Sequence, residues 1–146
     1  MIKLEKIDQS NWEACIRLKP RKEQEQYIAS NLYSIAEVQF LHGFEVKAIY
    51  LENDMIGFAM YGIDQDDGNY WIYRFMIDAQ FQGRGYGYLA MLQIIDEISK
   101  RADRSSVLRL GYNPNNEQAK KMYAKLGFQE EGIAPWGEML ASYQWD

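Results

Sequence analysis

The sequence predicts one α/β domain of the α+β kind, spanning residues 1–146 and built around a mixed central sheet of about seven strands. A length of 146 residues suits a single domain, and 47% of them are hydrophobic, so a substantial core can form. Strand-like and helix-like segments follow one another in the order β-α-α-β-β-β-α-β-α-β-β. A doubly wound fold alternates strands and helices strictly. Here three strands are consecutive, so part of the sheet should be antiparallel.

The chain begins with a strand and a short helix. Ile2–Lys6 alternates apolar and polar residues, as a half-buried strand does. Asn11 or Ser10 is expected to cap a helix that runs through Leu18, because a small polar side chain accepts hydrogen bonds from the free N–H groups of the first turn. Pro20 should interrupt this helix.

A second helix and three consecutive strands are predicted for the middle of the chain. Glu23–Val38 carries apolar residues at helical spacing. Glu45–Leu51 and Met55–Ile63 have the composition of strands, and Glu52–Asp54 between them is predicted to be a hairpin turn. Tyr70–Ile77 is rich in aromatic and β-branched residues, which is typical of a long buried strand.

Helices and strands alternate in the second half of the chain. Gly85–Arg101 is the clearest helix, because its apolar residues gather on one face. That face is predicted to contain Tyr88, Met91, Leu92, Ile95, Ile98 and Ala102. Val107–Tyr112 is the next strand, and Glu117–Leu126 is a helix that Gly127 ends as a left-handed cap. The last two strands are predicted over Phe128–Ile133 and Glu138–Trp145.

The net charge of −5 is concentrated in one part of the chain. The window Glu45–Asp67 holds six acids and one base, and the remainder is balanced. An acidic balance argues against nucleic acid as a partner, because phosphate binding needs clustered Lys and Arg. It is compatible with a cationic ligand, although turn and loop acids are more often simply solvated.

Several other classes of protein are not expected. No stretch approaches the roughly 20 apolar residues of a membrane helix, and the start of the chain has no signal-peptide core, so a cytoplasmic protein is predicted. Cys15 is the only cysteine, so neither an internal disulfide nor a thiolate metal cage can form, and no metal site is expected. His42, the only histidine, is expected at the surface.

The sharpest local feature is the segment Gln82-Gly83-Arg84-Gly85-Tyr86-Gly87, between the buried strand and the clearest helix. Glycines let a backbone turn tightly and approach a ligand closely, and a helix start offers unpaired N–H groups and the positive end of the dipole. Together these features predict an anion site suited to a pyrophosphate. A glycine-rich turn without a ligand is the alternative.

Two common phosphate-binding motifs do not account for this segment. A P-loop needs Lys and Ser or Thr after its last glycine, but Gly87 is followed by Tyr88. The dinucleotide pattern G-x-G-x-x-A is matched from Gly85 to Ala90, but that motif follows its strand almost directly and needs an acid at the end of the next strand. Neither condition is met here.

A third pattern, Q/R-x-x-G-x-G/A, is matched by Gln82-x-x-Gly85-x-Gly87. It resembles the acetyl-CoA pyrophosphate loop of the GCN5-related N-acetyltransferase (GNAT) superfamily. The segment from Asn116 through Ala119 and Tyr123 to Phe128 looks like the family's second cofactor segment, in the right order along the chain. Within the superfamily, residues 71–87 look similar to bacterial spermine/spermidine (diamine) N-acetyltransferases.

This resemblance implies acetyl-CoA as cosubstrate and a set of residues that bind it. The backbone of Phe75, Met76 and Ile77 would pair with the pantetheine arm. The pyrophosphate would be held by Gln82, Gly83, Arg84, Gly85, Tyr86, Gly87 and Tyr88. Asn116 would bond the cofactor arm, and a helix cap is its alternative role.

The resemblance also implies the chemistry, which is direct acyl transfer from a thioester to an amine. Tyr123 would protonate the departing thiolate, since the pKa of tyrosine, about 10, lies above that of a thiol, about 8.5. Several polyamine acetyltransferases of the family have a glutamate base on the strand before the glycine loop, but this position is Tyr73 here, followed by Arg74. The base is therefore open: Glu52, Asp64 and Glu138 are candidates, and the amine could also arrive deprotonated. Neither Cys15 nor a serine is placed for an acyl-enzyme.

The best prediction for the acceptor is a polyamine or a related small amine. Such cations need spaced carboxylates together with aromatic faces for their methylene spacers. The acceptor-binding candidates are Glu37, Glu52, Asp64, Tyr73 and Glu138. The aromatic residues interleaved with the acids are Tyr50, Tyr61, Tyr70, Trp71 and Tyr73.

Two alternatives to a polyamine acetyltransferase stay open. The acceptor could be an aminoglycoside, an amino acid or a peptide amine, or the chain could be an acyl-CoA-binding module without turnover. A homodimer is common in the family, and Trp136 and Trp145 are candidate interface residues.

Overall fold

The computed structural model describes residues 1–145, and its helices and strands follow the predicted order. The strands are β1 (Ile2–Lys6), β2 (Phe44–Leu51), β3 (Asp54–Ile63), β4 (Tyr70–Ile77), β5 (Val107–Tyr112), β6 (Gln129–Ile133) and β7 (Met139–Gln144). The α-helices are α1 (Trp12–Arg17), α2 (Asn31–Val38), α3 (Tyr86–Ser99) and α4 (Glu117–Leu126). Two 3₁₀ helices, η1 (Lys22–Tyr27) and η2 (Ala79–Phe81), complete the set.

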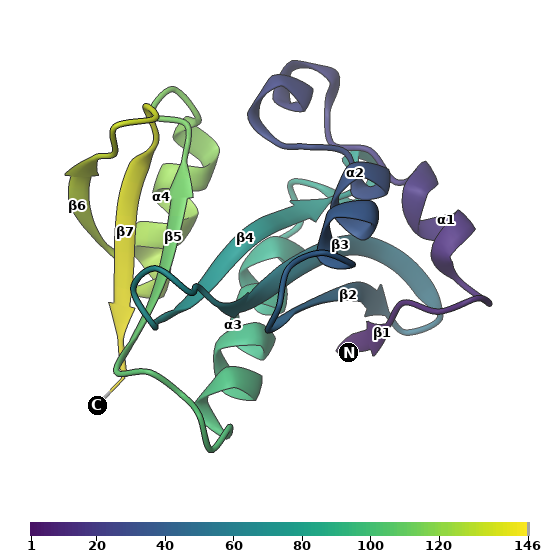
Figure 1. Ribbon diagram of the computed structural model, residues 1–146. Coiled ribbons are helices and arrows are strands. Elements are labelled where there is room, and N and C mark those ends of the chain that lie inside the picture. Colours follow the sequence, from purple (N-terminus) through teal and green to yellow (C-terminus); the bar gives the residue numbers. More distant parts are fainter. Residues whose placement is uncertain (146) are drawn as a thin grey trace.

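The strands form one seven-stranded sheet in the order β1-β2-β3-β4-β5-β7-β6. The pair β4–β5 is parallel, and the other neighbouring pairs are antiparallel. This confirms the mixed sheet expected from three consecutive strands. Helix α3 connects β4 to β5, as a parallel pair requires a crossover (Figure 1).

Helices cover both faces of the sheet. Helices α3 and α4 pack together on one face, whereas α1 and α2 cover the other face beside β2 and β3. Along β3, Ala59 and Tyr61 belong to the core beneath α3, and Phe58 and Met60 belong to the core beneath α1 and α2. Burial on both faces explains why β3 is almost continuously apolar. Within residues 1–145, no helix combines the length and apolar character needed to cross a bilayer.

Strands β4 and β5 are paired over only a short distance. Their paired residues are Tyr70 with Leu108, Trp71 with Arg109, and Ile72 with Leu110. Beyond this point the two strands diverge, as the separation of β4 from β5 in Figure 1 shows. The remainder of β4 therefore has one edge bonded to β3 and one edge without a strand partner.

The structure corrects three predictions about the helices. Glu23–Val38 is not one helix: η1 ends at Tyr27, Ile28 is extended, and α2 starts anew because the Ser30 side chain accepts a hydrogen bond from the N–H of Tyr33. Asn11 occupies the cap position of α1, but neither it nor Ser10 caps the helix through its side chain.

The side chain of Asn11 instead closes the preceding turn, bonding the carbonyl of Lys6 and the N–H of Asp8. On α3, Leu92 is exposed and Tyr88 is only partly buried, whereas Ile94, which was not predicted, is completely buried; Ala102 is exposed and lies beyond the end of the helix. The buried face of α3 is centred on Met91, Ile94, Ile95 and Ile98 because β1 and α4 pack on it from either side.

Gly62 gives the first testable prediction. A Cβ added at this residue would lie 2.2 Å from the carbonyl oxygen of Gly43 and 2.6 Å from the Cα of Phe44. These are backbone atoms held by the β2–β3 ladder, so they cannot move aside cheaply. We expect Gly62→Ala to lower the free energy of unfolding by about 1–3 kcal/mol. Urea unfolding measures this as a lower midpoint with an unchanged m-value, and an unchanged midpoint would contradict the prediction.

Candidate active site

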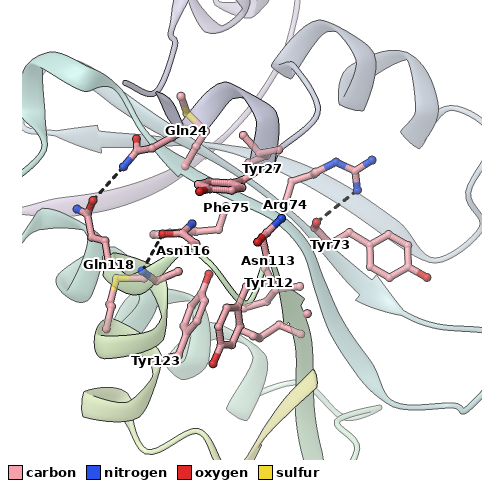
Figure 2. Close-up of a pocket in the computed structure, with 18 of the residues that line it drawn as sticks. Gln24, Tyr27, Tyr73, Arg74, Phe75, Tyr112, Asn113, Asn116, Gln118 and Tyr123 are labelled. Atoms are coloured by element: carbon pink, nitrogen blue, oxygen red, sulfur yellow. Dashed lines mark hydrogen bonds between the residues drawn. The ribbon is translucent and has the colours of Figure 1, made fainter. Parts of the chain in front are cut away.

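A cavity of about 1170 Å³ occupies the opening between β4 and β5. It is lined by segments that are far apart in the sequence: η1, the glycine loop, α4, the β3–β4 loop, and the residues around the start of β7. Figure 2 shows Gln24 and Tyr27 on one side of this cavity, facing Asn116, Tyr112 and Tyr123 on the other. A large, partly apolar cavity with convergent polar groups is the expected form of a ligand site.

The glycine loop forms one end of the cavity, as the sequence predicted. Gly83 and Gly85 have φ angles of +79° and +84°, which residues with a side chain rarely adopt. Gly85 is the N-cap of α3, so the unpaired N–H groups of the first turn lie beside the loop. At Gly87, a Cβ would lie 3.3 Å from the sulfur of Met122, so a glycine here allows α3 to pack closely against α4.

Most of the predicted loop residues reach the cavity. The lining includes Gln82, Gly83, Gly85, Tyr86, Gly87 and Tyr88. Arg84 is exposed and lies outside the lining, so the geometry does not support its predicted contact with the pyrophosphate. The groups that the loop offers to an anion are therefore backbone N–H groups and the positive end of α3, and the pyrophosphate site stays a prediction.

The free edge of β4 lines the next part of the cavity. Phe75, Met76 and Ile77 all contribute to the lining, and their paired edge is bonded to β3. The opposite edge faces the opening and has no strand partner after Ile72. Such an edge offers the alternating N–H and C=O groups that an amide-bearing arm can pair with.

Helix α4 contributes a polar side chain and two lysines. Asn116 accepts a hydrogen bond from the N–H of Ala119 (3.2 Å), and its amide NH₂ group stays available to a ligand, so it can serve both predicted roles. Lys121 and Lys125 line the cavity, and the Lys125 ammonium lies 4.6 Å from the ring centroid of Tyr88. Sequence reasoning had not selected these lysines, although their i,i+4 spacing on the helix of Asn116 was visible.

Tyr123 lies on the same helix and lines the cavity. Its ring is buried between those of Tyr112 and Phe128, each 5.6 Å away between centroids. Within residues 1–145 its hydroxyl makes no hydrogen bond. Burial, and after it the negative charge of Glu138, raises the pKa of Tyr123 above its usual value of about 10. The hydroxyl therefore stays protonated and free to donate to a ligand.

A β-bulge shapes the middle of β4. Arg74 pairs with Met60 and Ile72 pairs with Tyr61, so Tyr73 is an extra residue opposite β3. Arg74 forms an ion pair with Glu37 of α2, with 2.9 Å between nitrogen and oxygen. The hydroxyl of Tyr73 donates a hydrogen bond to Asp64.

The β3–β4 loop brings a group of acids to the cavity. Asp64 accepts a hydrogen bond from the N–H of Asp66 (2.7 Å), and Asp67 accepts hydrogen bonds from Trp71 (2.9 Å) and Arg109 (2.8 Å). Burial acts to raise the pKa of Asp67, but these hydrogen bonds and those from Asn69 outweigh it and hold the pKa below its usual value. The carboxylate of Asp66 makes no hydrogen bond or ion pair within residues 1–145.

Charge is distributed unevenly along the cavity. All five lining acids lie away from the glycine loop: Glu37, Asp64, Asp66, Asp67 and Glu138. We call this part the acceptor end, and its only lining bases among the described residues are Arg74 and Arg109. The part formed by the glycine loop, Lys121 and Lys125 is the cofactor end. One cavity thus presents an anion-binding end and a cation-compatible end.

Comparison with known proteins decides the family. Residues 4–128 match the model of the acetyltransferase (GNAT) family. The chain belongs to the GNAT family. It is an acetyl-CoA-dependent N-acetyltransferase, in agreement with the resemblance found in the two sequence motifs. A GNAT enzyme from Bacillus subtilis (strain 168), named spermine/spermidine N(1)-acetyltransferase, is 28% identical over 137 residues, which is 90% of each chain.

Solved GNAT structures confirm the fold. The aminoglycoside acetyltransferase AAC(6')-Ib in complex with coenzyme A superposes with a TM-score of 0.82 at 14% identity, covering 99% of this chain and 95% of the other. The ribosomal L7/L12 alpha-N-protein acetyltransferase RimL in complex with coenzyme A gives a TM-score of 0.80 at 17% identity, covering 98% and 93%. Acetyl-CoA is the cosubstrate of this GNAT enzyme, and the anion site and free strand edge described above fit it.

The structure removes some predicted residues from the acceptor site. Glu52 lies in the β2–β3 turn, where it pairs with the N-terminal amine (2.6 Å), and it does not line the cavity. The hydroxyls of Tyr61 and Tyr70 bond Glu97 and Asp103 away from the cavity. Of the predicted aromatic residues, only Trp71 and Tyr73 line it. Sequence spacing could not reveal this, because a strand's direction and the path of its turn decide which residues meet.

The two tryptophans near the C-terminus differ in their surroundings. Trp136 is 64% exposed and lies at the rim of the cavity. Trp145 packs edge-on against Tyr143 and lies 5.2 Å from the guanidinium of Arg104, and its role at an interface stays a prediction. Within residues 1–145 no group of His, Cys, Asp and Glu is arranged to hold a metal ion.

A row of glutamine amides joins three walls of the cavity. Gln82 donates to the carbonyl of Ile77 and to the amide oxygen of Gln24, both at 2.8 Å. Gln24 in turn donates to Gln118 of α4 at 2.9 Å, a bond that Figure 2 shows across the cavity. The glycine loop, η1 and α4 are therefore linked, a role of Gln24 and Gln118 that the sequence had not indicated.

Cys15 lies away from the active-site cavity. It is fully buried in α1, and burial raises the pKa of its thiol to about 12. The chain's only cysteine is therefore a protonated core residue and not a nucleophile for an acyl-enzyme.

Proposed function

We propose that this enzyme transfers the acetyl group of acetyl-CoA to a primary amine of a polyamine such as spermine or spermidine. The observation that carries the proposal is the charge distribution of the cavity. Its acceptor end gathers five carboxylates and two guanidiniums, whereas its cofactor end has lysines and helix N–H groups. An anionic cofactor and a cationic acceptor match these two ends.

The acceptor end also offers surfaces for the methylene spacers of a polyamine. The rings of Trp71, Tyr73 and Trp136 line it, and aromatic faces attract ammonium groups as well as apolar chains. The name of the relative from B. subtilis supports the same acceptor class. The fold neighbours named for aminoglycoside and ribosomal-protein acetylation share the architecture, which does not select an acceptor.

We propose a direct reaction in a ternary complex, with Tyr123 as the general acid. The glycine loop holds the pyrophosphate, and the free edge of β4 orients the pantetheine amides towards Tyr123. Acetyl-CoA supplies the thioester. Tyr123 donates its proton to the departing sulfur, because its raised pKa keeps the hydroxyl protonated until a thiolate forms nearby.

A panel of amines tests this function. Release of free thiol from acetyl-CoA is measured with spermine, spermidine, an aminoglycoside, amino acids and a peptide with a free N-terminus. We expect the highest kcat/KM for the polyamines. Turnover restricted to the other amines would refute the polyamine acceptor. Turnover of none of them would favour a binding module and refute the proposed activity. A homodimer and a cytoplasmic location stay predictions.

Asp66 provides a finer test of the acceptor end. Its carboxylate is exposed, lines the cavity and has no partner within residues 1–145, so its removal should leave the fold intact. We expect Asp66→Asn to raise KM for spermidine several-fold, by roughly 1 kcal/mol of lost attraction, with little change in kcat. The matched control is Asp54→Asn, at an exposed acid that begins β3 and lies outside the cavity. Equal KM values for the two variants would remove Asp66 from the acceptor site.

A further inference from the structure

The acids of the acceptor end differ in how many of their carboxylate oxygens already accept hydrogen bonds or form ion pairs. Glu37 is paired with Arg74, and Asp64 accepts a hydrogen bond from Tyr73 on one oxygen and backbone N–H groups on the other. Asp67 accepts hydrogen bonds from an indole and a guanidinium. Both oxygens of Asp64 and of Asp67 accept hydrogen bonds, whereas Glu37 keeps one oxygen without a hydrogen bond but lies on α2, where a guanidinium holds it.

The side chain of Glu138 has one carboxylate oxygen that accepts no hydrogen bond within residues 1–145. It lies directly before β7 and lines the cavity. Its Oε1 accepts a hydrogen bond from the indole N–H of Trp136 (2.7 Å), and its Oε2 makes no hydrogen bond within residues 1–145. Asp66 is also uncommitted, but it belongs to the loop that precedes β4. Glu138 is therefore the uncommitted carboxylate on the β5 side of the cavity.

Gly111 leaves room for this carboxylate to lie against β5. It follows Leu110, the last residue of β5 that pairs with β4. A Cβ built on Gly111 would lie 2.9 Å from Oε1 of Glu138, 3.3 Å from its Cδ and 3.4 Å from its Cβ. The side chain of Glu138 thus lies flat on the strand at the point where β5 leaves β4, in space that any other residue at position 111 would occupy.

We propose that Glu138 is the general base that accepts the proton of the attacking amine, and that Gly111 is the positioning residue that gives its carboxylate access to the reacting atoms. The inference rests on the proposed function, since it assumes that the amine enters from the acceptor end. Glu138 and Tyr123 line the same cavity, and Glu138 is near enough for its charge to raise the pKa of Tyr123. Strand β4 itself carries no carboxylate: Tyr73 is the extra residue of its bulge, and Arg74 pairs with Met60.

The protons and bonds balance without another reactant. The amine nitrogen forms a bond to the acetyl carbon, the carbon–sulfur bond breaks, and the sulfur takes the proton of Tyr123. The nitrogen becomes far more acidic as its bond to the carbonyl carbon forms, so its proton then passes readily to a carboxylate. Once Glu138 is neutral, its charge no longer raises the pKa of Tyr123, so the acid becomes stronger as the thiolate leaves. Solvent returns the proton from Glu138 to Tyr123 after product release.

The test compares Glu138→Gln with wild type, using the best acceptor from the amine panel. We expect kcat at pH 7 to fall by about 100-fold, within the range typical of a lost general base. Calorimetry should give an unchanged Kd for acetyl-CoA. The deficit in kcat should shrink at pH 9.5, because hydroxide and free amine then replace the missing base. A deficit that is equal at both pH values would indicate lost packing and overturn the proposal, as would full activity.

The role of Gly111 is tested by non-additivity. Gly111→Ala should reproduce the loss in kcat and its pH dependence, and the double variant Gly111→Ala/Glu138→Gln should be no worse than Glu138→Gln alone. Losses that multiply would show that Gly111 acts independently of Glu138. A melting temperature for each variant separates a folding defect from a chemical one, and Glu138→Gln tests the base even if Gly111→Ala does not fold.

The matched control is Glu131→Gln. Glu131 is an acid of the same hairpin, paired with Arg109 at 3.0 Å and outside the cavity lining. Glu131→Gln removes the same charge as Glu138→Gln but at a residue outside the cavity, so kcat should stay within about twofold of wild type. Calorimetric binding of the amine to the protein without acetyl-CoA gives a second readout, where Glu138→Gln should weaken binding more than Glu131→Gln. If the best acceptor is not a polyamine, the polyamine assignment fails while the comparison of these variants still tests Glu138.

Discussion

Substituting Gly85→Glu should abolish acetyl-CoA binding, with Kd rising by at least about 100-fold, or about 2.7 kcal/mol. A Cβ at Gly85 meets no atom of the protein within 4 Å, so the new side chain clashes with nothing in the fold. Its carboxylate would instead stand at the N-cap of α3, where the pyrophosphate is expected. Two anions cannot share the positive end of one helix, and calorimetry with acetyl-CoA measures the loss.

The controls for this substitution separate backbone strain from charge. Gly85 has a φ of +84°, so any side chain costs about 1–2 kcal/mol of folding stability. Gly132→Glu introduces the same charge at another glycine of positive φ, +113°, with nothing within 4 Å of its Cβ, on β6 away from the cavity. It should bind acetyl-CoA as wild type does, and Gly85→Ala should lose less affinity than Gly85→Glu. An unchanged Kd for Gly85→Glu would remove the glycine loop from the cofactor site.

Tyr123→Phe should lower kcat by about 100-fold and leave the Kd for acetyl-CoA almost unchanged. The ring stays in its place between Tyr112 and Phe128, and the hydroxyl makes no hydrogen bond within residues 1–145, so the free energy of unfolding should change little. Only the proton for the departing sulfur is lost. Steady-state kinetics and calorimetry on the same preparation measure the two effects.

Tyr143→Phe is the matched control for Tyr123→Phe. Its ring lies in the same aromatic stack, 5.6 Å from Phe128, but it does not line the cavity, so kcat should be unaffected. The pH dependence of wild-type kcat gives a second test of Tyr123. Burial raises the pKa of Tyr123, so the protonated form persists above pH 10 and wild-type kcat should not decline between pH 8 and pH 10. Full activity of Tyr123→Phe would exclude this residue as the general acid.

Much of the fold could be predicted because its signals are local. The bounds of β4, β5 and α4 agree with the predicted ranges, since a run of aromatic and β-branched residues or an amphipathic turn pattern is decided by neighbours in sequence. The prediction failed in Glu23–Val38, where helical spacing continued across the extended residue Ile28. The start of a new helix at Ser30 is indicated by a single capping residue, which is easily overlooked within a continuous apolar pattern.

The candidate site divides in the same way. The glycine loop, Asn116 and Tyr123 were predicted through the resemblance of their motifs to the GNAT family, and the structure brings all three to one cavity. Gln24, Lys121 and Gly111 were not selected, because the role of each depends on residues that are distant along the chain. Glu52 was predicted for the acceptor site because it lies in the acidic window of the sequence, but the structure pairs it with the N-terminal amine outside the cavity.

The sequence by itself determined the class of fold through hydrophobic periodicity, and its two motifs carry the resemblance to the GNAT family. It also predicts an anion site at the glycine loop, because glycines allow a tight turn close to a ligand. Only the tertiary structure decided which charges of an acidic chain face the ligand. The net charge of −5 does not place the acids, but the divergence of β4 from β5 gathers five of them at one end of a cavity. The tertiary structure also places Glu138 against Gly111, because β5 and β7 pair in the sheet although they are separated in the sequence.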